Sequence, residues 1–305
     1  MYDENQPLDK NNFHVSLEKV EKFEKYAQLM AICAPSALDD ENSFSLYHHA
    51  TDNFMRELDR LQDKIMLCSD GEELDQAIKN GKKAVFLTVE DARILHNDIN
   101  RLAVLYWRKT RFLTLLWGGE SCIGGSHNTN IGLTNFGKQV TKECFNIGII
   151  PDISHASEKS ADDVVEIALS ANKPFIASHS NAYSVYDHSR NLRDRHIKTI
   201  CELSGLIGIS LCRSHLCNKK EETPTVNTVI KHIDYYLSKG AENSLAFGCD
   251  FDGTDLPDGI SSISDIDKIA NKLAQNGYSE KLINKIYFEN AYNFIKKNLM
   301  PAIEQ

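Results

Sequence analysis

Short runs of apolar residues alternate along the chain with longer segments in which apolar residues recur at helical spacing. A continuous apolar run of about four to eight residues is typical of a strand buried on both faces, as in a parallel sheet. Such runs predict strands at Gln28–Cys33, Ile65–Cys68, Ala84–Val89, Phe112–Trp117, Gly148–Ile153, Pro174–Ala177, Leu206–Leu211 and Leu245–Cys249. Helical spacing predicts helices at Phe44–Leu61, Glu72–Asn80, Thr134–Phe145, Lys159–Ser170, Asp194–Leu203, Val226–Leu237, Ile263–Gln275 and Ser279–Asn298.

This alternation indicates the class of fold. About eight strand–helix units in a chain of this length predict an α/β protein with a TIM-like (β/α)8 barrel. We expect residues 1–305 to form a single domain. The alternative is an open, doubly wound parallel sheet, but no GxGxxG sequence follows the first predicted strand, as it does in the dinucleotide-binding proteins of that class.

Polar or aromatic side chains stand at the C-terminal ends of several predicted strands. Because the C-terminal ends of barrel strands converge on one face, which carries the active site in TIM-like enzymes, we expect these side chains to lie close together. They are Glu90 after AVFLTV, Trp117 after FLTLL, His155 after GIIPDIS, His179 after KPFIAS, and Asp250 and Asp252 after LAFGC.

Three of these residues have the chemistry of a metal site. A carboxylate at Glu90 and imidazoles at His155 and His179 suit zinc or a similar divalent ion, and a carboxylate can bridge two ions. By itself, each histidine is more typical of a capping or core residue. The placement of all three at strand ends favours the metal site.

Two further residues have chemistry suited to a substrate. Asp250, in the sequence GCDFDG, could accept a proton from an activated water or hold a substrate amine, and the alternative is an aspartate that forms a turn. Arg190 follows His179 in a loop and suits a substrate carboxylate or a tetrahedral oxyanion. The alternative for a single loop arginine is a solvated side chain.

Composition excludes several classes of partner. The chain has 34 Lys and Arg residues against 43 Asp and Glu residues, and its net charge of −9 argues against nucleic acid or an anionic membrane surface. It has no apolar run of about 18 residues, the length that a membrane span needs. Eight cysteines without a CxxC pair indicate reduced thiols, and the polar start of the sequence lacks the features of a signal peptide. From the lack of a signal peptide and a composition rich in Lys, Asn and Ile, we expect a bacterial cytoplasmic protein.

Three stretches carry a resemblance to a known family. The sequences GLTNFGKQV and NIGIIPDISHASEKSADDVVEIALSANKPFIASHSNAYSVYDHSRNL, followed later by GCDFDG, resemble the membrane (renal) dipeptidase family, the M19 metallopeptidases. The resemblance extends from about Asn12 to the C-terminus and is most specific between Gly132 and Asn191.

The resemblance implies a TIM-like barrel that hydrolyses dipeptides and accepts a D-residue at the C-terminal position. It implies two zinc ions bridged by Glu90, with His155 and His179 as ligands of the second ion. Arg190 would bind the substrate carboxylate, and Asp250 would face the substrate amine or the leaving group. Related enzymes are often dimers, so by analogy we expect a homodimer.

The sequence departs from the family pattern in three places. The family carries an HxD sequence at the end of its first barrel strand, and none occurs near the start of this chain. We therefore expect the first barrel strand and two metal ligands to be missing, through truncation or a misplaced start codon, and the run Ile65–Cys68 to lie outside the main barrel. Trp117 stands where mammalian members have a substrate-facing histidine, and we expect it to contact substrate. Asp91 stands where a glycine usually follows the bridging glutamate.

The function we predict is metal-assisted hydrolysis of a dipeptide, with Glu90 holding the ions and Asp250 assisting proton transfer. A second hypothesis is another metal-dependent amidohydrolase that acts on a cyclic amide or lactone, although the HxH sequence of such enzymes does not occur near the start. A third is a non-catalytic barrel that binds one ion or a peptide, which the missing HxD sequence favours.

Overall fold

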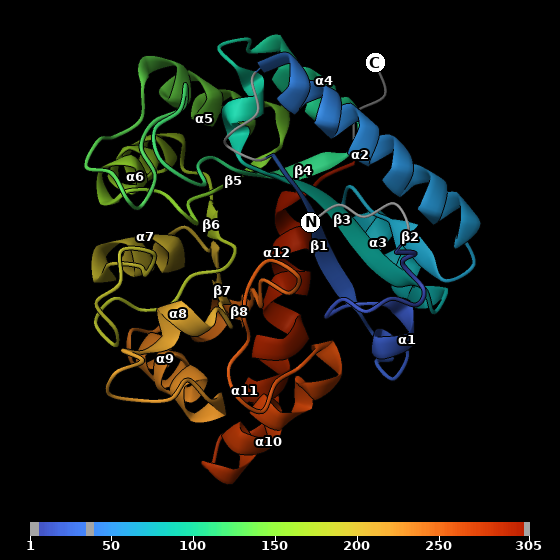
Figure 1. The fold of residues 1–305 in the computed structure, drawn as a ribbon, viewed down its shortest axis with the longest axis vertical. Helices are drawn as coiled ribbons and strands as arrows, with labels where there is room; N and C mark the ends of the chain where they lie inside the picture. The colour runs from blue at the N-terminus through green and yellow to red at the C-terminus, as the bar shows by residue number, and fades with distance from the viewer. Residues whose placement is uncertain (1–5, 35–39, 302–305) are drawn as a thin grey trace. The chain divides into compact units, whose positions relative to one another are not determined.

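The computed structural model describes residues 6–34 and 40–301 (Figure 1). Contacts between residues divide the chain into two compact units. Among the described residues, the N-terminal unit comprises 23–34, 40–175 and 295–301, and the C-terminal unit comprises Gln6–Lys22 and Ile176–Phe294. Within the described residues, no helix combines the length and the hydropathy that a membrane crossing requires.

The sheet of the N-terminal unit is built around one long strand, β3. Its parallel strands are β1 (Ala27–Cys33), β2 (Ile65–Leu67), β3 (Lys83–Glu90), β4 (Thr110–Thr114) and β5 (Ile150–Asp152). β1 pairs with one edge of β3 from Ala84 to Glu90. On the opposite edge, β2 pairs with the first residues of β3 and β4 pairs with the last, and β5 follows β4. β2 therefore lies outside the order β1-β3-β4-β5, as expected for this segment.

The apolar residues of β3 explain why this strand lies at the centre of the sheet. All six residues from Ala84 to Val89 are buried, and Phe86 packs edge-on against Phe112 with 6.3 Å between the ring centroids. Helix α2 contacts β1 and β2, and α3 contacts β2 and β3 (Figure 1). The helices of this unit are α2 (Asp40–Arg60), α3 (Gly71–Lys79), the 3-10 turn η1 (Ala92–Leu95), α4 (Asn100–Trp107), α5 (Asn135–Ile147) and α6 (Glu158–Ala171).

The C-terminal unit contains three further parallel strands. β6 (Ile176–Ala177), β7 (Leu206–Ile209) and β8 (Leu245–Phe247) pair in chain order. Tyr236 of α9 is fully buried beside them and donates its hydroxyl hydrogen to the Ser180 carbonyl, 3.0 Å away. The helices of this unit are α1 (Leu17–Val20), α7 (Asp194–Glu202), α8 (Arg213–Leu216), α9 (Val226–Ser238), η2 (Ala241–Asn243), η3 (Ile263–Asp265), α10 (Asp267–Gln275), α11 (Glu280–Asn284), η4 (Lys285–Glu289) and the first residues of α12 (Asn290–Asn298).

Two glycines allow the backbones of the C-terminal unit to approach closely. Gly208 in β7 and Gly248 after β8 both face the carbonyl oxygen of Ser178, which follows β6. A Cβ atom would lie 1.8 Å from this oxygen at Gly208 and 1.7 Å from it at Gly248. These distances are far inside van der Waals contact, so only glycine fits at either position.

The structure contains strands at all eight predicted places, with shifted ends. It differs from the prediction of one regular helix over Ser279–Asn298, because α11 passes into the π-helical segment η4 before α12 begins. The side-chain amide of Asn290 donates to the carbonyls of Glu242 at 2.9 Å and Leu245 at 2.8 Å, which anchors the chain at the end of this wider turn. Among the described residues the first strand is β1, and the loss of a preceding barrel strand stays a prediction.

Candidate metal and substrate site

Glu90 and His155 lie next to each other because the strands that carry them are in register. Glu90, the last residue of β3, pairs with Thr114 of β4, and Thr114 pairs with Asp152 of β5. His155 follows β5 after one tight turn. As a result, Nε2 of His155 lies 2.9 Å from Oε1 of Glu90.

A buried aspartate shapes the turn that presents His155. The carboxylate of Asp152 accepts the hydroxyl hydrogen of Thr114 at 2.6 Å and the N–H of Ser154 at 2.9 Å. His155 has a φ of 71°, in the left-handed region that residues other than glycine seldom adopt. The N–H of His127 donates to the His155 carbonyl at 2.7 Å and helps to hold this backbone conformation.

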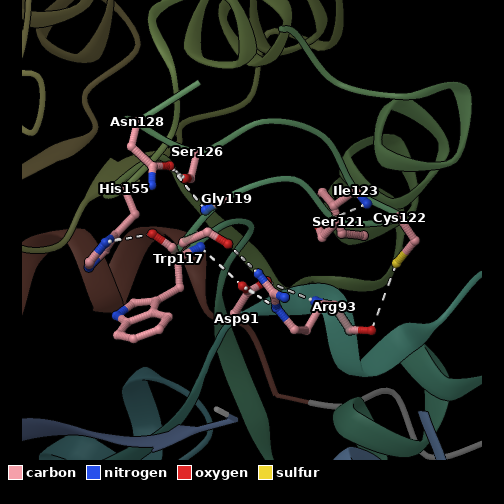
Figure 2. Close-up of polar contacts among 11 residues, drawn as sticks. Asp91, Arg93, Trp117, Gly119, Ser121, Cys122, Ile123, Ser126, Asn128 and His155 are labelled. Atoms are coloured by element: carbon pink, nitrogen blue, oxygen red, sulfur yellow. Dashed lines mark hydrogen bonds and ion pairs between the residues drawn. The ribbon is translucent and has the colours of Figure 1, made fainter. Parts of the chain in front are cut away.

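The His155 ring is oriented by the backbone of Trp117. Nδ1 of His155 lies 3.1 Å from the Trp117 carbonyl oxygen, as Figure 2 shows. A carbonyl oxygen only accepts hydrogen bonds, so Nδ1 carries the hydrogen and Nε2 of the neutral ring keeps a lone pair. This lone pair and the Glu90 carboxylate then face each other, an arrangement that a shared proton or a metal cation satisfies. The donor set therefore fits a divalent metal ion.

The residue after Glu90 is a fully buried acid, Asp91. Burial raises the pKa of Asp91, and this rise is opposed by the charge of Arg93 and by the N–H groups of Arg93 and Trp117. Nε of Arg93 lies 2.7 Å from Oδ2 of Asp91. A carboxylate in this environment is tolerated because each of its oxygens accepts a hydrogen bond.

Two aromatic side chains flank His155. Its ring centroid lies 6.3 Å from that of Trp117 and 5.7 Å from that of His127. Trp117 was singled out from the sequence as a substrate contact, whereas His127 was not. The sequence feature that could have indicated His127 is its position in the loop from Gly118 to Asn130, which is rich in glycine, serine and asparagine.

His179 and Arg190 lie together in the C-terminal unit. His179 follows β6 and is buried, and its Nδ1 lies 2.7 Å from the Ser178 hydroxyl. Nη2 of Arg190 donates to the His179 carbonyl at 3.3 Å. The Arg190 N–H donates to Nδ1 of His188 at 3.2 Å, and burial, with the charge of Arg190, lowers the pKa of His188.

Asp250 lies in a strained turn after β8. Both Asp250 and Asp252 have left-handed backbones, with φ of 58° and 69°. The Gly253 N–H donates to the Asp250 carbonyl at 3.2 Å and closes the turn. The turn is also tied to the start of the chain, because the Asp252 N–H donates to Nδ1 of His14 at 2.9 Å and the Asp252 carboxylate accepts the His14 N–H.

The structure thus brings some of the expected site residues together. Glu90, Trp117 and His155 meet in the N-terminal unit. In the C-terminal unit, His179 and Arg190 are in contact. The catalytic, substrate-binding and metal-binding roles of these residues, and of Asp250, stay predictions.

An α/β fold of parallel strands that carries a carboxylate beside an imidazole at its strand ends is typical of metal-dependent barrel hydrolases. The model of one such family, described as membrane dipeptidase (peptidase family M19), matches residues 2–301. The chain belongs to this family and is a metallo-dipeptidase by membership, so the recognition from sequence is confirmed.

Similar proteins include named dipeptidases. The dipeptidase tcpJ of Claviceps purpurea is 29% identical over 290 residues, which cover 87% of this chain and 67% of the relative. An uncharacterized protein in the pqqA 5' region of Klebsiella pneumoniae is 26% identical over 243 residues, 76% of this chain and 89% of the relative.

The fold is shared with a solved metallopeptidase of Rhodobacter sphaeroides, which was crystallised with a phosphinate mimic of the dipeptide L-Ala-D-Ala. The two chains are 23% identical and superpose with a TM-score of 0.88, over 95% of this chain and 92% of the other. This likeness shows the fold, and the predicted TIM-like α/β class is confirmed.

Proposed function

We propose that this chain is a zinc-dependent dipeptidase that accepts dipeptides with a D-residue at the C-terminal position. The observation that carries the proposal is the 2.9 Å approach of Glu90 Oε1 to His155 Nε2, while the Trp117 carbonyl occupies the other ring nitrogen. Family membership supports a dipeptide as substrate. The L-Ala-D-Ala mimic bound by the Rhodobacter sphaeroides relative supports the D-residue.

Three residues are proposed to hold the metal ion: Glu90, His155 and His179. In support, Glu90 and His155 already approach each other to 2.9 Å within one unit, and His179 offers a further imidazole at the end of a strand of the other unit. One carboxylate oxygen and two imidazole nitrogens suit zinc. When bound, zinc would supply a Lewis acid that polarises the scissile carbonyl and lowers the pKa of water.

The other residues are proposed to act on the substrate. Arg190 offers a guanidinium for the free carboxylate of the dipeptide, and its bond to the His179 carbonyl orients it beside a metal ligand. Asp250 offers a carboxylate that accepts a proton from water or holds the substrate amine. Trp117 is 36% exposed, and its indole offers an apolar surface to a substrate side chain.

Metal analysis and an activity assay test the proposal together. We expect zinc in the purified chain and hydrolysis of both L-Ala-D-Ala and L-Ala-L-Ala. Glu90→Gln should lower zinc affinity and the hydrolysis rate by about 100-fold or more, because it removes a ligand charge. Glu57→Gln is the matched control, because Glu57 is a partly exposed carboxylate of α2. This variant should keep the wild-type zinc affinity and hydrolysis rate.

Other outcomes would favour the alternative functions. Bound zinc without hydrolysis of any dipeptide would favour a non-catalytic metal- or peptide-binding barrel. Cleavage of a cyclic amide or lactone in place of dipeptides would favour another amidohydrolase. Full activity and metal content in Glu90→Gln would contradict the assignment of Glu90.

The chain is further proposed to act as a homodimer in the bacterial cytoplasm, with residues 1–305 forming one hydrolase domain. The scattered spacing of the eight cysteines, without a CxxC pair, supports a reducing compartment. Light scattering tests the dimer. Unfolding transitions that coincide by two spectroscopic probes would support one domain, and separate transitions would contradict it.

A further inference from the structure

We propose that Asp91 and Arg93 are positioning residues for the metal ligand His155. They act through the backbone of Trp117 and Gly118, which decides where the Trp117 carbonyl holds the His155 ring. The inference rests on the proposed function, because it concerns how His155 is presented to the ion.

Asp91 joins the end of β3 to the segment that follows β4. Its Oδ1 accepts the N–H of Arg93 at 2.9 Å and so caps the 3-10 turn η1. Its Oδ2 accepts Nε of Arg93 at 2.7 Å and the N–H of Trp117 at 3.1 Å (Figure 2). The Asp91 side chain has no exposed surface, so these hydrogen bonds are not exchanged for bonds to bulk water.

Arg93 holds the other end of the same segment. Its Nη2 donates to the Gly118 carbonyl at 2.6 Å. Its Nε at the same time donates to Asp91 (Figure 2). The Trp117 N–H and the Gly118 carbonyl belong to the peptide groups on either side of the Trp117 carbonyl. Because both neighbouring peptide groups are held by one ion pair, the carbonyl between them is held as well.

The local sequence explains why this segment needs such support. Two glycines, Gly118 and Gly119, follow Trp117, and neither has an atom within 4 Å of the place where a Cβ would stand. Glycine allows many backbone conformations, and packing does not restrict them here. Hydrogen bonds must therefore order the segment, and the Gly119 N–H adds one to Asn128 Oδ1 at 3.0 Å.

The consequence reaches both metal-binding groups of the N-terminal unit. The Trp117 carbonyl accepts the Nδ1 hydrogen of His155 and leaves Nε2 beside Glu90. Glu90 is the residue before Asp91, so the same turn directly follows the backbone of Glu90 and orients the imidazole of His155 through Trp117. Partners of this kind fix the tautomer and the ring direction of metal-binding histidines, and their loss weakens metal binding.

Three variants separate the parts of this arrangement. Arg93→Ala removes both contacts of the guanidinium. Arg93→Lys keeps the charge but cannot reach Asp91 and the Gly118 carbonyl through two nitrogens at once. Asp91→Asn keeps the shape and removes the charge. Asp70→Ala is the matched control, because Asp70 is also a buried capping aspartate of the N-terminal unit, at the start of α3.

Two measurements on the full chain test the proposal. Amide hydrogen exchange of Trp117 and Gly119 in the metal-free protein reports how firmly the backbone is held, and we expect about tenfold faster exchange or more in the Asp91 and Arg93 variants. Titration with zinc against a chelating dye should show about 10- to 100-fold weaker affinity in the same variants. Asp70→Ala should lower thermal stability but keep the wild-type exchange rates at Trp117 and Gly119 and the wild-type zinc affinity.

Folded Asp91 and Arg93 variants with wild-type zinc affinity would overturn the inference. An equal loss of affinity in Asp70→Ala would also overturn it, because the cause would then be general destabilisation. If Arg93→Ala does not fold, the amide exchange rates and zinc affinities of Arg93→Lys and Asp91→Asn test the proposal. A wild-type chain that binds no zinc would contradict the proposed function and the positioning role with it, whereas unaffected variants of a zinc-binding chain contradict the positioning role alone.

Discussion

At the scale of single residues, hydrogen bonds with backbone groups decide which atoms of an imidazole remain available for chemistry. The Trp117 carbonyl engages Nδ1 of His155 and leaves Nε2 facing the candidate metal site. His232 is the opposite case, because its Nδ1 accepts the Ala182 N–H at 3.1 Å and its Nε2 donates to the Leu216 carbonyl at 2.9 Å. Both nitrogens of His232 are used inside the fold, so its role is structural.

His232 should make the stability of the chain depend on pH. Burial lowers its pKa from 6.5 to about 4. As the pH falls below 6.5, the unfolded chain binds a proton that the folded chain does not, so this contribution to stability is complete above pH 6.5 and is lost toward pH 4. The loss over this range is about 3 kcal/mol.

Urea unfolding of the wild-type chain and of His232→Asn, between about pH 7.5 and pH 4, measures this effect. We expect the free energy of unfolding of the variant to fall less steeply over this range. His49→Asn, an exposed histidine on α2, is the control and should keep the wild-type slope. Equal slopes for the wild type and His232→Asn would show that another group is responsible.

At the scale of elements, close approach between backbones decides where β6 ends and where His179 stands. Gly208 and Gly248 both face the Ser178 carbonyl, one residue before His179. A side chain at either glycine would displace the end of β6. The two glycines therefore contribute to the candidate site without touching a ligand or a substrate.

Gly248→Ala should lower the free energy of unfolding by about 3 kcal/mol, because backbone atoms have to move to admit the methyl group. Gly277→Ala is the control, since Gly277 has a φ of +88° but open space around it. It should cost only about 1 kcal/mol of backbone strain. Urea unfolding measures the decrease in the free energy of unfolding of each variant. Equal decreases would contradict steric crowding of Gly248 against the Ser178 carbonyl.

At the scale of the whole molecule, metal binding and folding are linked, because folding brings Glu90 and His155 together from different strands. Zinc at 100 times its dissociation constant should raise the free energy of unfolding by about 2.7 kcal/mol. A chelator should reverse the gain. Thermal denaturation with and without zinc measures this stabilisation. The control variant Glu57→Gln should be stabilised by zinc as much as the wild type. Equal stabilisation of Glu90→Gln by zinc would show that the ion binds elsewhere.

Much of this fold could be predicted from local patterns. The run Ala84–Val89 indicates a central strand because only a strand buried on both faces has no polar side. The residues after such strands were predicted to meet because parallel strands present their C-terminal ends at one edge. The π-helical segment η4 was not predicted, because its anchor joins Asn290 to the distant carbonyls of Glu242 and Leu245.

The sequence by itself determined the family, the α/β class and the candidate ligands Glu90 and His155, because periodicity and motifs are read along a continuous stretch of chain. Only the tertiary structure decided how His155 is oriented and what Asp91 and Arg93 do. The physical reason is that each of these contacts joins a side chain that follows one strand to a backbone group that follows another. Backbone groups are the same at every residue, so no sequence pattern records which of them a side chain meets.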